Sequence, residues 1–352
     1  MDINNLFKLA AAKKASDIHL LYGRLPILRI DGALRDIDEV VADGSFAPLT
    51  AIDMEAFLDV MLTKDQKARF LDKRDLDLGY QVEAFRYRVN FSFEKDNIKI
   101  VARVIDDHQP TLDEIGMPEV VDDLLNLSQG FILVTGPTGC GKSTTLAAML
   151  NRINATRRAN IITLEDPIEF MFKPDKSVIS QRQLGTDMIS FAAGLKHVLR
   201  QDPNVIMVGE MRDLETISTA VTLAETGHLV LATLHTYSAA QTIDRIIDIF
   251  PPYQQGQIKS QLSSVLTAVI SQRLLPRVGG GRVAAREILL NNEAVANLIR
   301  EGKIAQIKST IETNATIGMV TLDHHLKQLY QAGQITRETA IGQMEDTRLL
   351  DN

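Results

Sequence analysis

The sequence predicts an α/β protein with two domains, and three observations support this prediction. The chain has 352 residues, which is longer than one typical hydrophobic core allows. Its first hundred or so residues have the pattern of a small α+β unit. From about residue 112, short apolar runs alternate with helical or loop segments, as in a parallel sheet. These runs lie at residues 131–134, 160–164, 204–208 and 229–234.

The N-terminal domain is expected to contain two helices and several strands. Residues 5–14 and 53–70 have helical spacing, and residues 27–32 have the pattern of a strand and turn. Two segments of period two, 85–93 and 98–105, flank a short polar turn and therefore predict a β-hairpin. The arginines of this hairpin alternate with apolar residues, so they should share the face opposite the packed one.

A polar, proline-containing segment at 106–111 marks the boundary between the domains. We therefore expect an N-terminal domain at 1–106, a hinge linker at 107–112 and a second domain at 113–352. The last domain should become largely helical after three consecutive glycines, from about residue 285 to the end.

The stretch GPTGCGKST at 136–144 fits the pattern G-x-x-x-x-G-K-[ST]. An apolar run enters it as a strand and a helix-forming run leaves it, so the context favours a phosphate-binding loop over a plain glycine-rich turn. Glycines let the backbone approach a polyphosphate and direct N–H groups at it. Lys142 would reach the β- and γ-phosphates, and Ser143 would ligate Mg²⁺. The expected nucleotide-binding residues are Gly136, Pro137, Thr138, Gly139, Cys140, Gly141, Lys142, Ser143 and Thr144.

The segment TLEDPIEF, residues 163–170, ends a predicted strand. Hydrolysis of a nucleoside triphosphate needs a carboxylate that orients or deprotonates the attacking water, and Glu165 is our first candidate for that base. The alternative is a solvated acidic loop in which Pro167 only ends the strand.

The segment DPNVIMVGEMRD, residues 202–213, is an apolar strand that ends in an acid, which is the Walker B pattern. Gly209 occupies the usual aspartate position, so Glu210 is the carboxylate available for the Mg²⁺ shell. It can act through a water, since Mg²⁺ keeps several of them. A buried strand with a surface acid at its end is the alternative.

The segment GHLVLATLHT, residues 227–236, is a buried strand with a histidine at each end. A lone histidine is more often a packed or capping group than a functional one. His228 and His235 are seven positions apart, so on an extended strand they point to opposite faces and at most one should face the γ-phosphate. His235, at the carboxyl end, is the better candidate, whereas His228 is a candidate for bridging to a neighbouring element.

Composition excludes several classes of protein. The formal net charge is −7 with no basic block, which argues against a dedicated nucleic-acid binder. The single cysteine, Cys140, excludes an internal disulfide and a multi-cysteine metal site. No apolar run approaches the roughly 18 residues of a membrane span, and the N-terminus is unlike a signal peptide. We expect a cytoplasmic protein with, at most, a peripheral membrane role.

The four segments together resemble the Walker A, Asp box, Walker B and His box of the secretion ATPase superfamily. The resemblance covers nearly the whole chain and extends to residues 15–20, 242–251 and 270–276. Within the superfamily the chain most resembles the type IV pilus retraction ATPases. Residues 294–301 are similar to their C-terminal motif but depart from it at Val295 and Ala296, the second of which replaces an arginine.

This resemblance implies a PAS-like α+β domain followed by a RecA-like P-loop ATPase domain with a helical C-terminal extension. It also implies a homohexamer with ATP between subunits. Arg88, Arg103 and Arg245 are then candidates for neutralising γ-phosphate charge in a neighbouring site, the alternative for the hairpin arginines being a solvated strand face. The implied partners are an inner-membrane pilus platform protein and a second retraction ATPase, at the base of the pilus; no nucleic-acid partner is expected.

Four other functions remain as alternatives. Pilus extension or secretion ATPases usually carry extra N-terminal domains and often a four-cysteine zinc motif, which this sequence lacks. An accessory retraction ATPase is harder to exclude, although the run at 210–213 favours the main retraction enzyme. A RecA-like nucleic-acid motor is disfavoured by the acidic charge and the absence of tryptophan. A GTP-dependent switch is disfavoured because no N-K-x-D follows the phosphate loop.

Overall fold

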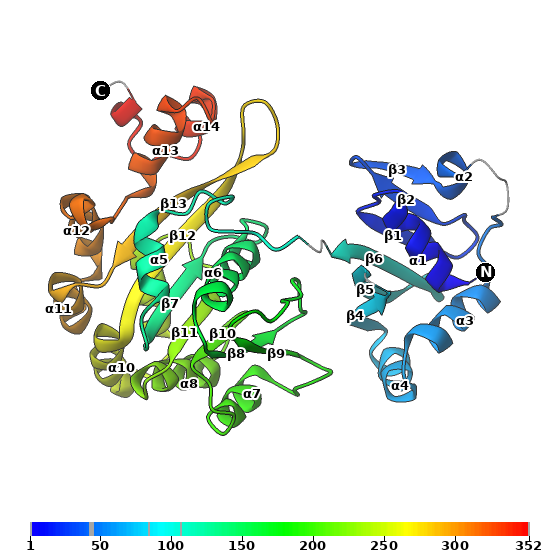
Figure 1. Ribbon diagram of the computed structural model, residues 1–352, viewed down its shortest axis with the longest axis horizontal. Coiled ribbons are helices and arrows are strands. Elements are labelled where there is room, and N and C mark those ends of the chain that lie inside the picture. The colour runs from blue at the N-terminus through cyan, green and yellow to red at the C-terminus, as the bar shows by residue number, and fades with distance from the viewer. Residues whose placement is uncertain (1, 42–45, 84, 106–107, 351–352) are drawn as a thin grey trace. The chain divides into compact units, whose positions relative to one another are not determined.

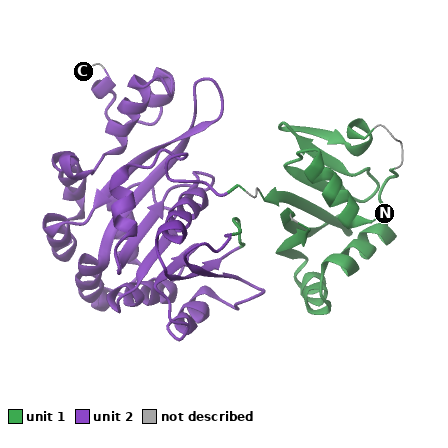
Figure 2. Cartoon of the chain, viewed as in Figure 1, with its two compact units in different colours: residues 1–108, 167–171 green, residues 109–166, 172–352 purple. Residues whose placement is uncertain are grey.

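The computed structural model describes residues 2–41, 46–83, 85–105 and 108–350, which fold into two compact units (Figure 2). Unit 1 consists of residues 1–108 together with 167–171, and unit 2 of residues 109–166 together with 172–352. The division after residue 108 falls within the linker expected at 107–112. Residues 106 and 107 of the predicted hinge segment lie outside the described residues.

Unit 1 is an antiparallel sheet with the strand order β3-β2-β1-β6-β5-β4 (Figure 1). Its strands are β1 (Asp17–Leu21), β2 (Ile27–Ile30), β3 (Ala33–Asp36), β4 (Asp75–Val82), β5 (Phe85–Glu94) and β6 (Asn97–Ile105). Its helices are α1 (Ile3–Ala12), α2 (Ile37–Val40), α3 (Ala51–Met61) and α4 (Lys64–Lys73). Tyr87 is fully buried in the core and donates a hydrogen bond to the carbonyl of Phe7 over 2.8 Å; burial raises the pKa of Tyr87 to about 12.

The predicted hairpin is confirmed by β5 and β6. Arg88 and Arg103 are direct cross-strand partners, so they lie on the same face of the sheet, opposite core residues such as Val89 and Ala102. The single helix expected at 53–70 is wrong, because α3 ends at Met61 and α4 starts at Lys64. Thr63 causes this break: its side chain accepts from the N–H of Gln66 while the Gln66 side chain accepts from the N–H of Thr63.

Unit 2 is built on a seven-stranded sheet with the order β13-β12-β7-β11-β10-β8-β9. All neighbours are parallel except β12 and β13. Its strands are β7 (Gly130–Thr135), β8 (Asn160–Glu165), β9 (Val178–Gln183), β10 (Val205–Val208), β11 (Leu229–Leu234), β12 (Leu266–Pro276) and β13 (Arg282–Leu290). Every residue of β7, β10 and β11 is buried, as expected of central parallel strands.

Helices cover this sheet and extend beyond β13. In Figure 1, α5 (Glu119–Leu125) and α6 (Lys142–Thr156) lie in front of the strands. The remaining α-helices are α7 (Phe191–Val198), α8 (Leu214–Glu225), α9 (Ala239–Asp248), α10 (Pro252–Val265), α11 (Glu293–Glu301), α12 (Ile307–Thr313), α13 (Leu322–Gln331) and α14 (Arg337–Ile341). Among the described residues, none of the helices combines the length and the apolar character that a membrane span requires.

The expectation of a largely helical chain from about residue 285 needs a correction. β13 runs to Leu290 and pairs with β12 in an antiparallel hairpin, so the helical part begins with α11 at Glu293. Gly279, Gly280 and Gly281 all have positive φ and reverse the chain between the two strands. The run from Ala284 to Leu290 has two charged residues, Arg286 and Glu287, between apolar ones, and so short a run without period-two alternation fits a helix as well as a strand.

The C-terminal helices pack on the β12–β13 hairpin through a small core. It contains Leu275, Ala285, Leu326, Leu329, Ile335 and Ala340. The buried Arg286 donates to the carbonyls of Ile115 and Gly116 over 2.7 and 2.9 Å, and its backbone N–H donates to Nδ1 of His325 over 2.8 Å. These contacts tie together β13, α13 and the segment that precedes α5.

The stability of the protein should fall in mild acid because of His325. Burial lowers the pKa of its imidazole to about 4, below the ordinary value of 6.5. Between these two values the unfolded chain binds a proton that the native state does not bind. The corresponding stability, up to about 3 kcal/mol, is therefore complete above pH 6.5 and is lost as the pH falls toward 4.

His325→Asn keeps a hydrogen-bond acceptor but cannot titrate, so its urea-unfolding midpoint should depend less steeply on pH between 6.5 and 4. His324→Asn changes the exposed neighbouring histidine and should keep the wild-type pH dependence. Equal slopes for wild type and His325→Asn would contradict this assignment.

Candidate active site

The glycine-rich loop at 136–141 joins the end of β7 to the start of α6. Gly136, Gly139 and Gly141 have φ values of 143°, 78° and 88°, which favour glycine. A Cβ atom at Gly136 would lie 2.3 Å from the backbone oxygen of Gln272 and 2.6 Å from Sγ of Cys140. The loop is therefore packed directly against β12.

The side chain of Gln272 forms hydrogen bonds with this loop and with the start of α6. It is 2% exposed, its Nε2 donates to the carbonyl of Cys140 over 2.7 Å, and its Oε1 accepts from Oγ1 of Thr145 over 2.9 Å. No role was predicted for Gln272, although it lies in the segment 270–276 that resembles the family. Its partners, Cys140 and Thr145, are 132 and 127 residues away in the sequence.

A chain of polar contacts runs from the loop to the next strands. Nζ of Lys142 donates to the carbonyls of Gly136 and Pro137 over 2.8 and 3.0 Å, and lies 3.4 Å from Nδ1 of His235. Nε2 of His235 lies 2.9 Å from Oε1 of Glu210. His235 thus connects the phosphate-loop lysine to the Walker B carboxylate, and it does so from the carboxyl end of β11.

Glu210 is further held by a bidentate ion pair with Arg212. Nε of Arg212 lies 2.7 Å from Oε1 of Glu210, and Nη2 donates to Oε2 over 2.7 Å. Burial raises the pKa of Glu210, but hydrogen bonds and charges from Arg212 and His235 outweigh that effect and lower the pKa below its ordinary value. Glu210 is therefore an ionised carboxylate. Arg212 is a further residue of this cluster, and no role was predicted for it from the sequence.

Glu165 lies at the end of β8 with its side chain fixed. It is 7% exposed, and its Oε1 accepts from Oγ1 of Thr163 over 2.5 Å and from Nε2 of Gln181 over 3.0 Å. This burial does not fit the alternative of a solvated acidic loop. A Cβ atom at Gly209 would lie 3.1 Å from the carbonyl oxygen of Leu164, so a side chain at this position would need a small shift of the end of β8.

His228 lies at the opposite end of β11 from His235. Its Nδ1 lies 2.9 Å from the carbonyl of Leu223 and 3.3 Å from Oγ1 of Thr226, so the ring caps the end of α8. Within one chain this geometry does not support a catalytic role for His228. That at most one of the two histidines faces the γ-phosphate stays a prediction.

Of the three candidate arginines, Arg88 and Arg103 belong to unit 1 and Arg245 belongs to unit 2. Arg245 is exposed on α9. Nε of Arg103 lies 2.8 Å from a carboxylate oxygen of Asp17, and Nε of Arg88 lies 4.0 Å from Oδ1 of Asp77, both within unit 1. Both hairpin arginines therefore have a carboxylate neighbour, but their side chains remain largely exposed, so the alternative of a solvated strand face stays open.

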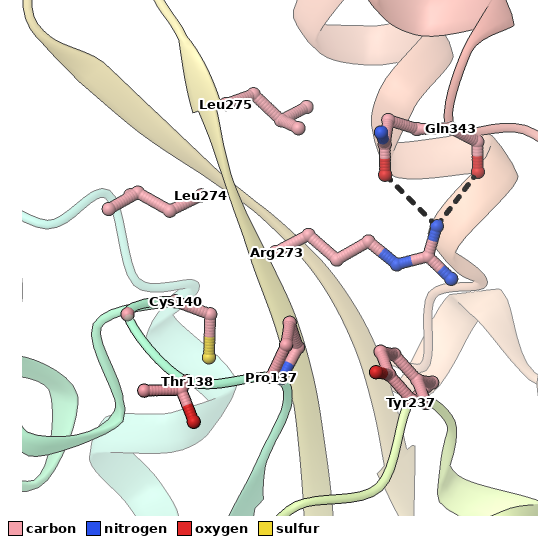
Figure 3. A pocket seen from close by; sticks show the side chains of 9 residues that line it. Pro137, Thr138, Cys140, Tyr237, Arg273, Leu274, Leu275 and Gln343 are labelled. Carbon is pink, nitrogen blue, oxygen red and sulfur yellow. Dashed lines mark hydrogen bonds between the residues drawn. The ribbon is translucent and has the colours of Figure 1, made fainter.

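Two cavities adjoin the glycine loop. The larger has a volume of about 670 Å³. Its lining includes Cys140, Gly141 and Thr144 of the loop and α6, together with residues 113–116 and Arg286. This volume falls in the range of small-molecule sites. The smaller, about 350 Å³, is bounded by the loop, Tyr237 and β12 (Figure 3). There Nη1 of Arg273 donates to the backbone and side-chain oxygens of Gln343, both over 3.1 Å.

Comparison with known proteins gives a consistent result. The model of the type II/IV secretion system protein family matches residues 1–347. The type IV pilus retractation ATPase PilT of Pseudomonas aeruginosa is 45% identical over 341 residues, covering 97% of each chain. The type IV pilus ATPase PilU of the same organism is 35% identical, over 99% of this chain and 91% of PilU.

A solved structure extends the similarity to three dimensions. The crystal structure of the pilus retraction motor PilT with bound ADP superposes with a TM-score of 0.91 at 41% identity, covering 100% of this chain and 99% of that one. The predicted fold, an N-terminal α+β domain joined to a RecA-like ATPase domain, is thereby confirmed.

Two glycines of the loop provide a matched test of its packing. Gly136→Ala places a Cβ against the backbone of β12, which cannot move aside without opening the sheet, whereas a Cβ at Gly139 meets nothing within 4 Å. Both positions have positive φ, so both variants should lose about 1–2 kcal/mol from backbone strain. Gly136→Ala should in addition weaken binding of a fluorescent ATP analogue by at least about tenfold, since the loop must leave its position. Equal affinities in the two variants would rule out this role for the contact with Gln272.

Proposed function

The chain belongs to the type II/IV secretion system protein family, whose PilT-type members are ATPases, and we propose that it is a hexameric motor that hydrolyses ATP to retract type IV pili. The observation that carries this proposal is the convergence of Lys142, His235, Glu210 and Glu165 at one edge of the parallel sheet. The match to PilT at 45% identity over 97% of both chains supports a retraction motor.

ATP would bind with its phosphates in the glycine loop. The loop N–H groups and the start of α6 offer partial positive charge to the phosphates, and Lys142 adds a full positive charge. The 670 Å³ cavity beside Cys140 and Thr144 would take the nucleoside.

Glu165 would act as the base of the reaction. Thr163 and Gln181 fix its carboxylate, so it can hold the attacking water and accept the proton released as the water oxygen bonds to the γ-phosphorus. The bond between the γ-phosphorus and the bridging oxygen breaks, and ADP leaves with that oxygen. His235 links Lys142 to Glu210 and is suited to report the state of the γ-phosphate to the Walker B strand.

The side-chain oxygens of Ser143 and Glu210 are suitable ligands for Mg²⁺, which binds a few protein oxygens and keeps several waters. Because Arg212 already occupies both carboxylate oxygens of Glu210, a contact through water fits better than direct ligation. Mg²⁺ bound there would neutralise charge on the β- and γ-phosphates.

The site needs further positive charge, since Arg212 is neutralised by Glu210. We propose that a neighbouring subunit of the hexamer supplies it through Arg88 and Arg103, with Arg245 as a further candidate. Arginines that act in this way contribute about 10³–10⁵ in rate. The motor would work at the cytoplasmic side of the inner membrane, against a platform protein of the pilus.

An accessory retraction ATPase is a second candidate function. It is favoured by Ala296, which replaces the arginine of the C-terminal retraction motif and is only 9% exposed on α11. The lower identity to PilU, 35% against 45% to PilT, weighs against it.

The proposal is tested by counting surface pili in cells that carry a chromosomal Lys142→Ala allele. Loss of the phosphate-binding ammonium should abolish hydrolysis, so a retraction motor predicts more surface pili and no twitching motility. Lys176→Ala, which removes an exposed lysine of the same unit, should leave both unchanged. Cells without pili would instead indicate an extension motor, and an unchanged pilus count would indicate an accessory ATPase.

A further inference from the structure

Four charged residues form a continuous row across the sheet of unit 1. Arg88 on β5 pairs with Arg103 on β6, Arg103 pairs with Asp17 on β1, and Asp17 pairs with Arg29 on β2. Direct cross-strand partners have Cβ atoms about 4.5–5.5 Å apart, and like charges in such positions repel. The row contains three arginines and one carboxylate. The negative charge of Asp17 therefore determines how the arginine side chains beside it are arranged.

Asp17 is buried although it is ionised. It is 5% exposed, and its carboxylate accepts from Nε of Arg103 and from Oγ of Ser16, each over 2.8 Å, with Nε of Arg29 at 3.5 Å. Burial raises the pKa of Asp17, but the hydrogen bonds from Arg103 and Ser16 and the charges of Arg103 and Arg29 outweigh it, so the pKa lies below 3.8. The carboxylate therefore stays negative at neutral pH.

Arg103 is both fixed and accessible. Its Nε is bonded to a buried carboxylate, yet 71% of its side-chain surface is exposed. Arg88 differs, since its nearest carboxylate oxygen, on Asp77, is 4.0 Å away and that side chain is itself 46% exposed. A long arginine side chain carries about 2 kcal/mol of rotamer entropy, and an anchor at Nε removes part of that freedom before any ligand binds.

We propose that Asp17 is a positioning residue for ATP hydrolysis: it holds the Arg103 guanidinium in the orientation in which Arg103 meets the γ-phosphate bound by a neighbouring subunit. This inference rests on the proposed function, in which Arg103 acts across the subunit boundary. Arg29 lies near the other carboxylate oxygen of Asp17, Oδ2, at 3.5 Å. Its Nη1 donates a 2.9 Å hydrogen bond to the carbonyl of Gly32, which holds the side chain in place. The segment around Asp17 thus fixes the orientation of Arg103 on the β5–β6 hairpin.

A double-mutant cycle on the full-length protein tests this inference. Arg103→Ala should lower kcat by at least about 100-fold with little change in KM for ATP. Asp17→Asn keeps the shape but loses the charge, and it should lower kcat by about tenfold or more, again with little change in KM. The double variant should be no slower than Arg103→Ala alone, because Asp17 acts through Arg103.

Asp59→Asn is the matched control, since it breaks an ion pair with Lys67 in the same unit and should retain wild-type kcat. If Asp17→Asn does not fold, Asp17→Glu gives a second test: it keeps the charge but shifts the carboxylate by one methylene, so kcat should fall while the thermal midpoint stays near wild type. A wild-type kcat in the Asp17 variants, or additive losses in the double variant, would overturn the inference. A wild-type kcat in Arg103→Ala would instead refute the proposed role of Arg103 itself.

Discussion

The parallel run of six strands determines where the chemistry of this protein can occur. In the order β7, β11, β10 and β8, neighbouring strands deliver Lys142, His235, Glu210 and Glu165 to one edge of the sheet. Because neighbouring strands lie about 4.8 Å apart, groups that follow their carboxyl ends fall within reach of one another. The contacts from Lys142 to His235 and from His235 to Glu210 follow the spatial order of the strands, although the residues are far apart in the sequence.

β12 extends this arrangement to the C-terminal helices. Gln272 reaches the phosphate loop, and the next residue, Arg273, binds Gln343 just after α14 (Figure 3). Successive side chains of a strand point to opposite faces, so one strand can contact the loop on one side and the helices on the other. A shift of β12 would therefore move the contacts with both the phosphate loop and Gln343. In the proposed motor, this strand is a direct physical connection between the nucleotide loop and the segment that follows α14.

Local patterns predicted much of this structure, and contacts between distant segments account for what was missed. The loop at 136–144 and the ends of the buried strands were predictable because each is a short motif with a fixed geometry. Strand direction alone favoured His235 over His228. β13 was missed because its mixed run of apolar and charged residues lacks a period-two alternation, and only its pairing with β12 shows that it is a strand. Gln272 was missed because its partners, Cys140 and Thr145, lie on a loop and a helix that only the strand order brings to it. Arg212 was overlooked although its partner, Glu210, is only two residues away in the sequence. The break at Thr63 was readable from its capping box but was overlooked.

The central claim of this account is that each ATP site is shared between two subunits. It is tested most directly by mixing two inactive variants, Lys142→Ala, which lacks the phosphate lysine, and Arg103→Ala, which lacks the arginine given to the neighbour. In randomly mixed rings roughly a quarter of the subunit boundaries would combine an intact Lys142 with an intact Arg103. ATPase activity should then recover to roughly that fraction of the wild-type rate. A mixture no more active than either variant alone would contradict the shared site.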